Sequence, residues 1–230
     1  MSDRSTAARP TARPLTLAVD VVLFTPRDQQ LAVLLTPAGP ATRPRERLLI
    51  PSDALRPDET LNTAAERIAR QASGSAPSLL EQAGAIGGAK RQPHLANVTI
   101  TYFGLIPDAS APRRTGEWIP IGEVDGLTDR AREELDLALG AMRARSDQQP
   151  IAFRLLPTAF TLSELQSVYE LLLGRRLHKA SFRRALHAAA LVEPTDEWRS
   201  EGRGRPAQLF RYLPPRRRRQ RRGIRFDLIG

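Results

Sequence analysis

The residues best suited to chemistry in this sequence are basic, and they recur at helical spacing after Lys179. One face of this predicted helix is apolar: Phe182, Ala185, Leu186 and Ala189. The other face carries Lys179, Ser181, Arg183, Arg184 and His187. Arginine is the usual bidentate reader of guanine, and the major groove admits one helix. We therefore predict that these five polar side chains contact double-stranded DNA.

A glycine- and arginine-rich segment farther along the chain adds a second basic element. Arg203 and Arg205 each follow a glycine, so the backbone can approach a partner closely, and we predict that both contact phosphate or the minor groove. The run from Arg216 to Arg222 is either a solvated basic tail or an additional phosphate contact. A single charged helix face is often merely solvated, but helix, turn, helix and basic loop in this order favour DNA binding.

A third group of charged residues lies in the first half of the chain. Glu59 and Arg67 fall around the start of a predicted helix, with Arg56 before them and Lys90 after them. In one interpretation, Arg67 pairs with Glu59 and holds a loop. In the other, Arg56, Glu59, Arg67 and Lys90 form a ligand site in which the cations meet a phosphate.

Other kinds of chemistry lack the residues they require. The chain has no cysteine, which excludes disulfides and thiolate catalysis. The histidines, His94, His178 and His187, do not have metal-ligand spacing. No Ser/His/Asp arrangement, phosphate-binding Walker loop or dinucleotide-binding glycine motif is recognisable. We therefore expect no catalytic residues, no bound metal and no cofactor.

The excess positive charge lies entirely in the last part of the chain. Residues 151–230 contain 17 Arg plus Lys against 7 Asp plus Glu, whereas residues 1–150 contain 18 of each. This asymmetry predicts a neutral domain and a basic one that meets a polyanion. Residues 1–13 have no apolar stretch and are expected to be a disordered leader. Because no segment is long and apolar enough to span a bilayer, we expect a cytoplasmic protein without a membrane partner.

Residues 14–148 are expected to form an α+β domain. Two aliphatic runs around Pro26 predict a β-hairpin, and apolar spacing closed by Gly74 predicts a central helix. The predicted elements are strands at Leu15–Thr25, Gln30–Thr36 and Ala96–Ile106 and helices at Leu61–Ser73 and Asp129–Arg145.

Residues 151–213 are expected to form a winged helix after a polar break at residues 146–150. Thr161 and Glu164 have the spacing of a capping box, and Gly174 is placed to end that helix. A second helix is predicted at Lys179–Leu191, followed by strands at Val192–Pro194 and Gln208–Tyr212. Residues 214–230 form the basic tail.

The segment Ile50–Gly74, IPSDALRPDETLNTAAERIARQASG, resembles a Nudix box. Glu59, Arg67 and Gly74 match the box, but its metal-binding glutamates are replaced by Ile68, Gln71 and Ala72. Hydrolysis by this family requires Mg²⁺, which binds carboxylate oxygens. The resemblance therefore implies a Nudix-like α/β/α sandwich without hydrolase activity.

The segments FTLSELQSVYELLLGRRLHKASFRRAL and GRGRPAQLFRY resemble the winged helix of Nudix-related transcriptional regulators of the NrtR type. The likeness extends over about residues 14–213. It implies a homodimer whose Nudix-like domain senses a small-molecule effector, ADP-ribose in several members and sugars in others. At Gly126–Arg130 this chain reads GLTDR, where the family often has an LAFDH-like stretch.

These observations together predict a bacterial transcriptional repressor. Its inactive Nudix-like domain would sense a nucleotide- or sugar-type metabolite, and its winged helix would bind a palindromic operator. One alternative is a Nudix pyrophosphohydrolase with an appended nucleic-acid-binding module. Another is a protein that binds nucleic acid without sequence preference through its arginines.

Overall fold

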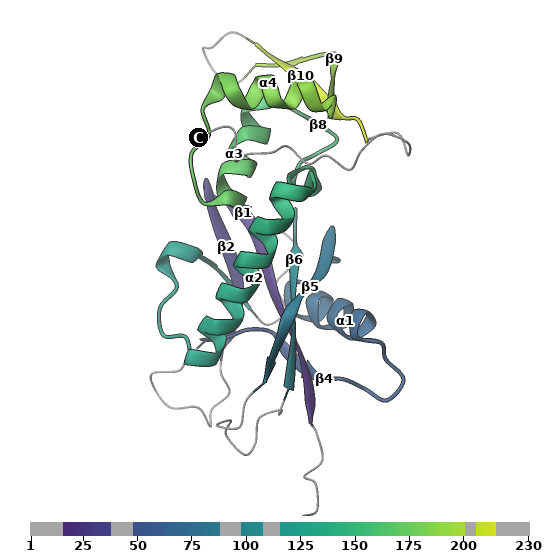
Figure 1. Cartoon of the computed structure of the whole chain (residues 1–230), viewed down its shortest axis with the longest axis vertical. Helices are drawn as coiled ribbons and strands as arrows, with labels where there is room; N and C mark the ends of the chain where they lie inside the picture. The colour runs from purple at the N-terminus through teal and green to yellow at the C-terminus, as the bar shows by residue number, and fades with distance from the viewer. Residues whose placement is uncertain (1–15, 38–47, 88–97, 108–115, 201–205, 215–230) are drawn as a thin grey trace, which may run out of the picture.

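The computed structural model describes residues 16–37, 48–87, 98–107, 116–200 and 206–214 (Figure 1). Within these ranges the chain forms a β-sheet with a helix on each face and a winged helix at one end. The leader, Lys90, Arg203, Arg205 and residues 215–230 of the tail lie outside the described residues.

The predicted hairpin is confirmed. Strands β1 (Leu17–Arg27) and β2 (Gln30–Pro37) pair antiparallel, with Arg27 opposite Gln30. Asp28 and Gln29 connect them with φ angles of 47° and 59°. Positive φ at both central residues is the requirement of a turn whose twist matches that of the strands.

The sheet is mixed, and its central pair is parallel. Its main path runs β3-β2-β1-β6-β5, with β4 paired to β1 and β7 paired to β2. Strands β1 and β6 are parallel, and the other pairs are antiparallel. The remaining strands are β3 (Leu48–Leu49), β4 (Ser52–Ala54), β5 (Leu79–Gly87), β6 (Val98–Leu105) and β7 (Glu117–Pro120).

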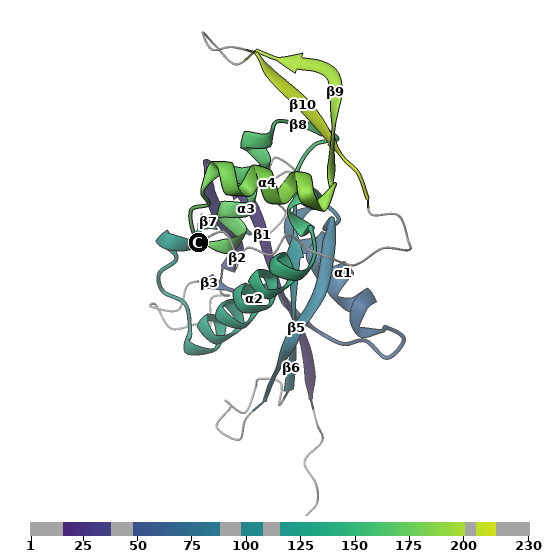
Figure 2. The ribbon, with the colours of Figure 1, turned by 45° about the horizontal axis from the view of Figure 1, so that its top comes forward.

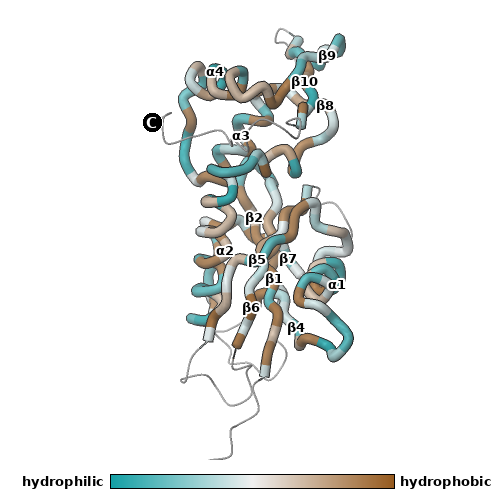
Figure 3. Tube along the Cα trace, turned by 45° about the vertical axis from the view of Figure 1, so that its right-hand side comes forward, coloured by the Kyte–Doolittle hydropathy of each residue, from teal (hydrophilic) through white to brown (hydrophobic). Residues whose placement is uncertain are grey.

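Alternating side chains of β1 face two different helices. Val19, Val21 and Leu23 belong to the apolar cluster under α1 (Leu61–Ser73). Val22 and Phe24 belong to the cluster under α2 (Asp129–Gln148), on the opposite face. The apolar residues accordingly follow the central strands (Figure 3). A short 3₁₀ helix, η1 (Ile121–Glu123), precedes α2.

The helix boundaries follow their caps. Both predicted ends of α1 are confirmed: Thr60 accepts a hydrogen bond from the Thr63 amide, and Gly74 adopts φ 80°. Helix α2 continues to Gln148, beyond the predicted Arg145. The hydroxyl of Ser146 donates to the Met142 carbonyl, so this polar residue is accommodated within the helix.

The C-terminal elements form the predicted winged helix. Helix α3 (Leu162–Leu173) begins with the predicted capping box of Thr161 and Glu164 and ends at Gly174. The other elements are η2 (Ile151–Leu155), β8 (Ala159–Phe160), α4 (Lys179–Ala189), β9 (Val192–Arg199) and β10 (Ala207–Tyr212). Strand order is β8-β10-β9.

Two boundaries in this module differ from the prediction. Helix α4 ends before Leu191, because Ala190 adopts a left-handed conformation with φ 50°. Strand β9 extends five residues past Pro194, to Arg199, since it pairs with the whole of β10. The two strands leave the end of α4 as a hairpin (Figure 2).

The winged helix shares a core with the sheet domain. One buried cluster includes Phe24 of β1, Met142 of α2 and Phe182 of α4. Ile151 and Leu155, directly after the expected polar break, are buried in the same cluster. The break in the sequence therefore does not separate the hydrophobic cores. Among the described residues, no helix has the length and apolar character needed to cross a bilayer.

Candidate functional site

Helix α4 has one buried and one basic face, as predicted. Phe182 and Leu186 are fully buried against the winged-helix core. Of the five DNA contacts predicted on this helix, four are exposed: Lys179, Arg183, Arg184 and His187. Ser181 is half-buried, lies 3.2 Å from Nδ1 of His178 through its hydroxyl, and accepts a weak hydrogen bond from Arg184. The basic side chains of this helix therefore lie on its exposed face and take no part in its packing against the core.

Carboxylates neutralise other arginines of this module. Three ion pairs join Arg176 to Glu170, Arg199 to Glu164 and Arg211 to Glu193. Within the ranges that the structure describes, Lys179, Arg183 and Arg184 have no such carboxylate partner. The unneutralised charge of α4 is thus available for an external anion.

Glu170 fixes the turn between α3 and α4. Its Oε1 accepts hydrogen bonds from Gln166 Nε2 at 3.0 Å and from the Leu177 amide at 2.9 Å, while Oε2 pairs with Arg176. Burial acts to raise the pKa of Glu170, but these donors outweigh it and hold the pKa below its usual value. The charged form of Glu170 is therefore the one that makes these contacts across the turn.

The loop end of the β9–β10 hairpin, where Arg199 lies opposite Ala207, is attached to the start of α3. Arg199 donates from Nη1 to Glu164 Oε1 at 2.7 Å and from Nη2 to the Ala159 carbonyl at 3.3 Å. Because Glu164 also caps α3, one carboxylate connects the cap and the wing. Thr195 adds a hydrogen bond to the Leu209 carbonyl within the hairpin.

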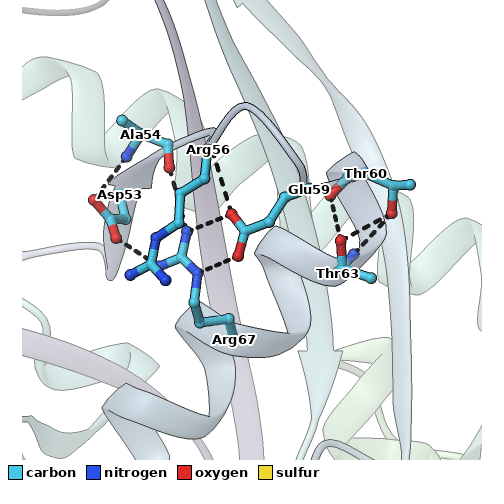
Figure 4. Close-up of polar contacts among 7 residues, drawn as sticks. All are labelled: Asp53, Ala54, Arg56, Glu59, Thr60, Thr63 and Arg67. Carbon is cyan, nitrogen blue, oxygen red and sulfur yellow. Dashed lines mark hydrogen bonds and ion pairs between the residues drawn. The ribbon is translucent and has the colours of Figure 1, made fainter.

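In the Nudix-like segment, Arg67 is surrounded by acceptors (Figure 4). Its Nε and Nη2 donate to the two oxygens of Glu59 at 2.6 and 2.9 Å, and its Nη1 donates to Asp53 at 2.5 Å. The hydrogen bond from Arg67 holds the pKa of Glu59 below its usual value. The pairing of Arg67 with Glu59, one of the two sequence interpretations, is confirmed.

The structure therefore brings together three of the four residues predicted to bind a ligand, Arg56, Glu59 and Arg67. Arg56 is exposed and contributes its backbone amide to Glu59. The ligand role of Arg56, Glu59, Arg67 and Lys90 stays a prediction. Of the three positions that replace box glutamates, Ile68 and Ala72 are buried in the core under α1, and Gln71 is exposed. No group of acidic or histidine residues suited to a metal occurs among the described residues.

A buried ionic cluster on the opposite face of the sheet was not predicted. Arg130, in the first turn of α2, donates to Asp20 of β1 at 2.7 Å and to Glu134 at 2.5 Å. Thr99 accepts from the same guanidinium, and Ser52 donates to Asp20. Asp20 and Glu134 are 1% and 2% exposed. Burial, together with the hydrogen bond and charge of Asp20, raises the pKa of Glu134 to about 8.

The sequence carried one signal of this cluster. Asp20 is the only charged residue in the apolar run LTLAVDVVLFT, and a carboxylate within a buried strand requires a partner. Its partner could not be identified, since Arg130 is 110 positions away.

Comparison with known proteins places this geometry among transcriptional regulators. The model of the NrtR DNA-binding winged helix domain matches residues 152–212. A protein of Acinetobacter baylyi named ADPR responsive transcriptional repressor NtrR is 32% identical over 206 residues, which are 85% of this chain and 81% of that protein.

Two solved structures extend the likeness to the whole fold. Shewanella oneidensis NrtR in complex with a 27mer DNA has a TM-score of 0.73 and 30% identity, covering 86% of this chain and 94% of its own. A MutT/nudix family protein from Enterococcus faecalis has a TM-score of 0.67 and 18% identity, covering 88% and 89%. The second likeness concerns the fold alone.

Proposed function

Because the chain belongs to the NrtR family of Nudix-related transcriptional regulators, we propose that it is a repressor controlled by a small metabolite. The winged helix, residues 151–213, binds a palindromic operator through α4 and the wing. The Nudix-like domain, residues 14–148, binds a nucleotide- or sugar-type effector that changes the affinity for DNA. As a repressor it acts on chromosomal DNA in the bacterial cytoplasm.

The observation that supports DNA recognition by α4 is its unneutralised basic face. Lys179, Arg183 and Arg184 are exposed, while Phe182 and Leu186 on the other side are fully buried. A helix held rigidly by its apolar side can insert its polar side into the major groove without losing packing. The proposed contacts are Lys179, Ser181, Arg183, Arg184 and His187, together with Arg203 and Arg205.

The test is a double substitution, Arg183→Ala with Arg184→Ala, in the full chain. Duplexes selected from a random pool by the wild-type protein serve as the DNA. We expect weaker binding and a shallower dependence on salt by roughly one unit of slope for each lost phosphate contact. Arg70→Ala, an exposed arginine on α1, is the matched control. Equal affinity of the double variant and the wild type would refute the assignment.

ADP-ribose is the first effector to test, since the Acinetobacter baylyi relative is named for its response to it. Calorimetric titration of the full chain with ADP-ribose, NAD and sugar phosphates would rank these candidates. Of the predicted ligand contacts that the structure describes, Arg56 is the one whose exposed side chain is not part of the Arg67 pairing, which leaves it able to meet a phosphate. Arg56→Ala is expected to weaken effector binding, and unchanged affinity would remove Arg56 from the site.

We also propose that the Nudix-like domain has no hydrolase activity. The positions of the metal-binding glutamates hold Ile68, Gln71 and Ala72, and two of these side chains lie in the apolar core. The protein should not release products from ADP-ribose, NADH or nucleoside diphosphate sugars with Mg²⁺ or Mn²⁺. Turnover of roughly 1 per second or faster would instead support the pyrophosphohydrolase alternative.

A further inference from the structure

The wing contains an aromatic residue that the fold leaves uncovered. Trp198 of β9 is 56% exposed, whereas Trp118 of β7 is only 4% exposed. Phe160, Tyr169 and Phe182 of the same winged helix are fully buried. The other aromatic rings of the winged helix, Phe153, Phe210 and Tyr212, are half-buried. A large indole that is more exposed than every other aromatic ring of its module is typical of a contact surface.

Trp198 is held near the far end of the hairpin. It lies opposite Gln208 in the pairing of β9 with β10, and the next residue, Arg199, is bound to Glu164 and to the Ala159 carbonyl. The strand carrying the indole is therefore fixed to the start of α3. A strand that is already fixed loses little backbone freedom when it meets a partner.

The hairpin and α4 lie at the same end of the molecule, and β4 lies toward the opposite end (Figure 1). This is the end where α4 carries its unneutralised cations. Trp198 is therefore carried by the end of the molecule at which α4 is proposed to bind DNA. Its neighbours Asp196 and Glu197 are exposed carboxylates, which repel phosphate, so an uncharged contact suits this position better than an ionic one.

We propose that Trp198 packs against the sugar edges of duplex DNA beside the segment read by α4. The apolar surface of the indole contacts the deoxyriboses. The carboxylates beside it repel the phosphates and so keep this part of the wing away from them. This inference rests on the proposed DNA contact of α4, and it assigns a second contact of a different chemical kind. A contact without charge adds affinity and releases no counterions.

Binding and salt dependence together test the proposal. In the full chain, Trp198→Ala should weaken binding to the selected duplexes roughly tenfold. The slope of log affinity against log salt should stay that of the wild type. The double substitution Arg183→Ala with Arg184→Ala should make that slope shallower. An unchanged slope in the double variant would show that the α4 assignment is wrong, independently of the result for Trp198. Leu213→Ala, at the other large apolar residue that is exposed in the described structure, is the control and should bind like the wild type.

Fluorescence gives an independent readout of the same contact. The chain has two tryptophans, and the emission lost in Trp198→Phe belongs to Trp198 while buried Trp118 serves as the internal reference. On adding duplex, the Trp198 component should become shielded from iodide. The proposal is overturned by wild-type affinity in Trp198→Ala or by unchanged quenching with DNA. It is equally overturned if shielding follows protein concentration without DNA, since the indole would then contact a second copy.

Discussion

Arg130 and Asp20 join the start of α2 to the middle of the sheet through a 2.7 Å hydrogen bond between Nη2 and Oδ2. Their positions are 110 residues apart in the sequence, and the guanidinium also binds Glu134. Two buried carboxyl groups, those of Asp20 and Glu134, therefore contact one cation. Because the other end of α2 packs into the core of the winged helix, this cluster fixes the helix that connects the two parts of the molecule.

Removing the cation should be strongly destabilising. Arg130→Met retains most of the apolar side chain but leaves Asp20 and Glu134 buried without their partner. Breaking a buried ion pair in this way costs about 3 to 5 kcal/mol. Urea denaturation at pH 7 measures the loss. Arg70→Met on the exposed side of α1 is the control and should stay within about 0.5 kcal/mol of the wild type. A similarly small change in Arg130→Met would contradict the role of the cluster.

Glu134 should make the stability depend on pH. Its pKa is raised to about 8, above the ordinary value of 4.5, so the folded state binds the extra proton between these values. Stability contributed by this group is complete below about pH 4.5 and declines as pH rises to about 8. Between pH 6 and 9 the expected loss is on the order of 3 kcal/mol. Urea titrations at pH 6 and at pH 9 measure the free energy of unfolding. In Glu134→Gln the difference between these two free energies should disappear. A decline of equal size in the variant would assign it to other groups.

Glu170 offers a test of the helix-turn-helix geometry with two graded variants. Glu170→Gln can keep the hydrogen bonds that Oε1 accepts from Gln166 and Leu177 and lose only the ion pair with Arg176. Glu170→Ala loses all three contacts and leaves the Leu177 amide without its acceptor. We expect a cost of about 1 to 3 kcal/mol for alanine and a smaller one for glutamine, measured by thermal unfolding. Equal effects of the two variants would show that the hydrogen bonds to Oε1 do not hold the turn.

The local elements were predictable where a cap defines them, and long-range contacts were not. Apolar spacing, Gly74 and the Thr161–Glu164 box are recognisable in the sequence, so the predicted bounds of α1 and the predicted start of α3 are correct. Strand β5 was missed, because LLEQAGAIG has one β-branched residue and an interior run of three small residues, Ala83, Gly84 and Ala85, instead of an alternating pattern. Position 84 favours glycine, because a Cβ there would lie only 3.1 Å from the side chain of Leu137 in α2. That requirement comes from tertiary packing, as does the choice of Arg130 as the partner of Asp20.

Two positions of the Nudix-like segment, Ile68 and Gln71, allow a paired test of whether the fold still tolerates the glutamates of the box. Ile68 is 3% exposed, whereas Gln71, at another box glutamate position on the same helix, is exposed. Ile68→Glu should destabilise the protein by several kcal/mol, because it buries a carboxylate in an apolar core. Gln71→Glu should change stability by less than about 0.5 kcal/mol. Thermal unfolding compares the two. If Ile68→Glu were as stable as the wild type, position 68 would be able to hold a charged ligand.

The last prediction concerns the working unit, which we expect to be a homodimer on a two-fold symmetric operator. A single DNA-binding module buries only about 600 to 1,000 Å², too little for the affinity that a search through a genome requires. Two modules on half-sites about one helical turn apart would supply the remainder. Residues 1–150 carry 18 charges of each sign, so two copies of this domain do not repel one another as two basic modules would. Since the two parts share a core, the test uses the full chain: it should sediment as a dimer at micromolar concentration. Scrambling one half-site of the selected duplex should weaken binding strongly, and a monomer that binds the intact and the scrambled duplex equally would exclude this arrangement.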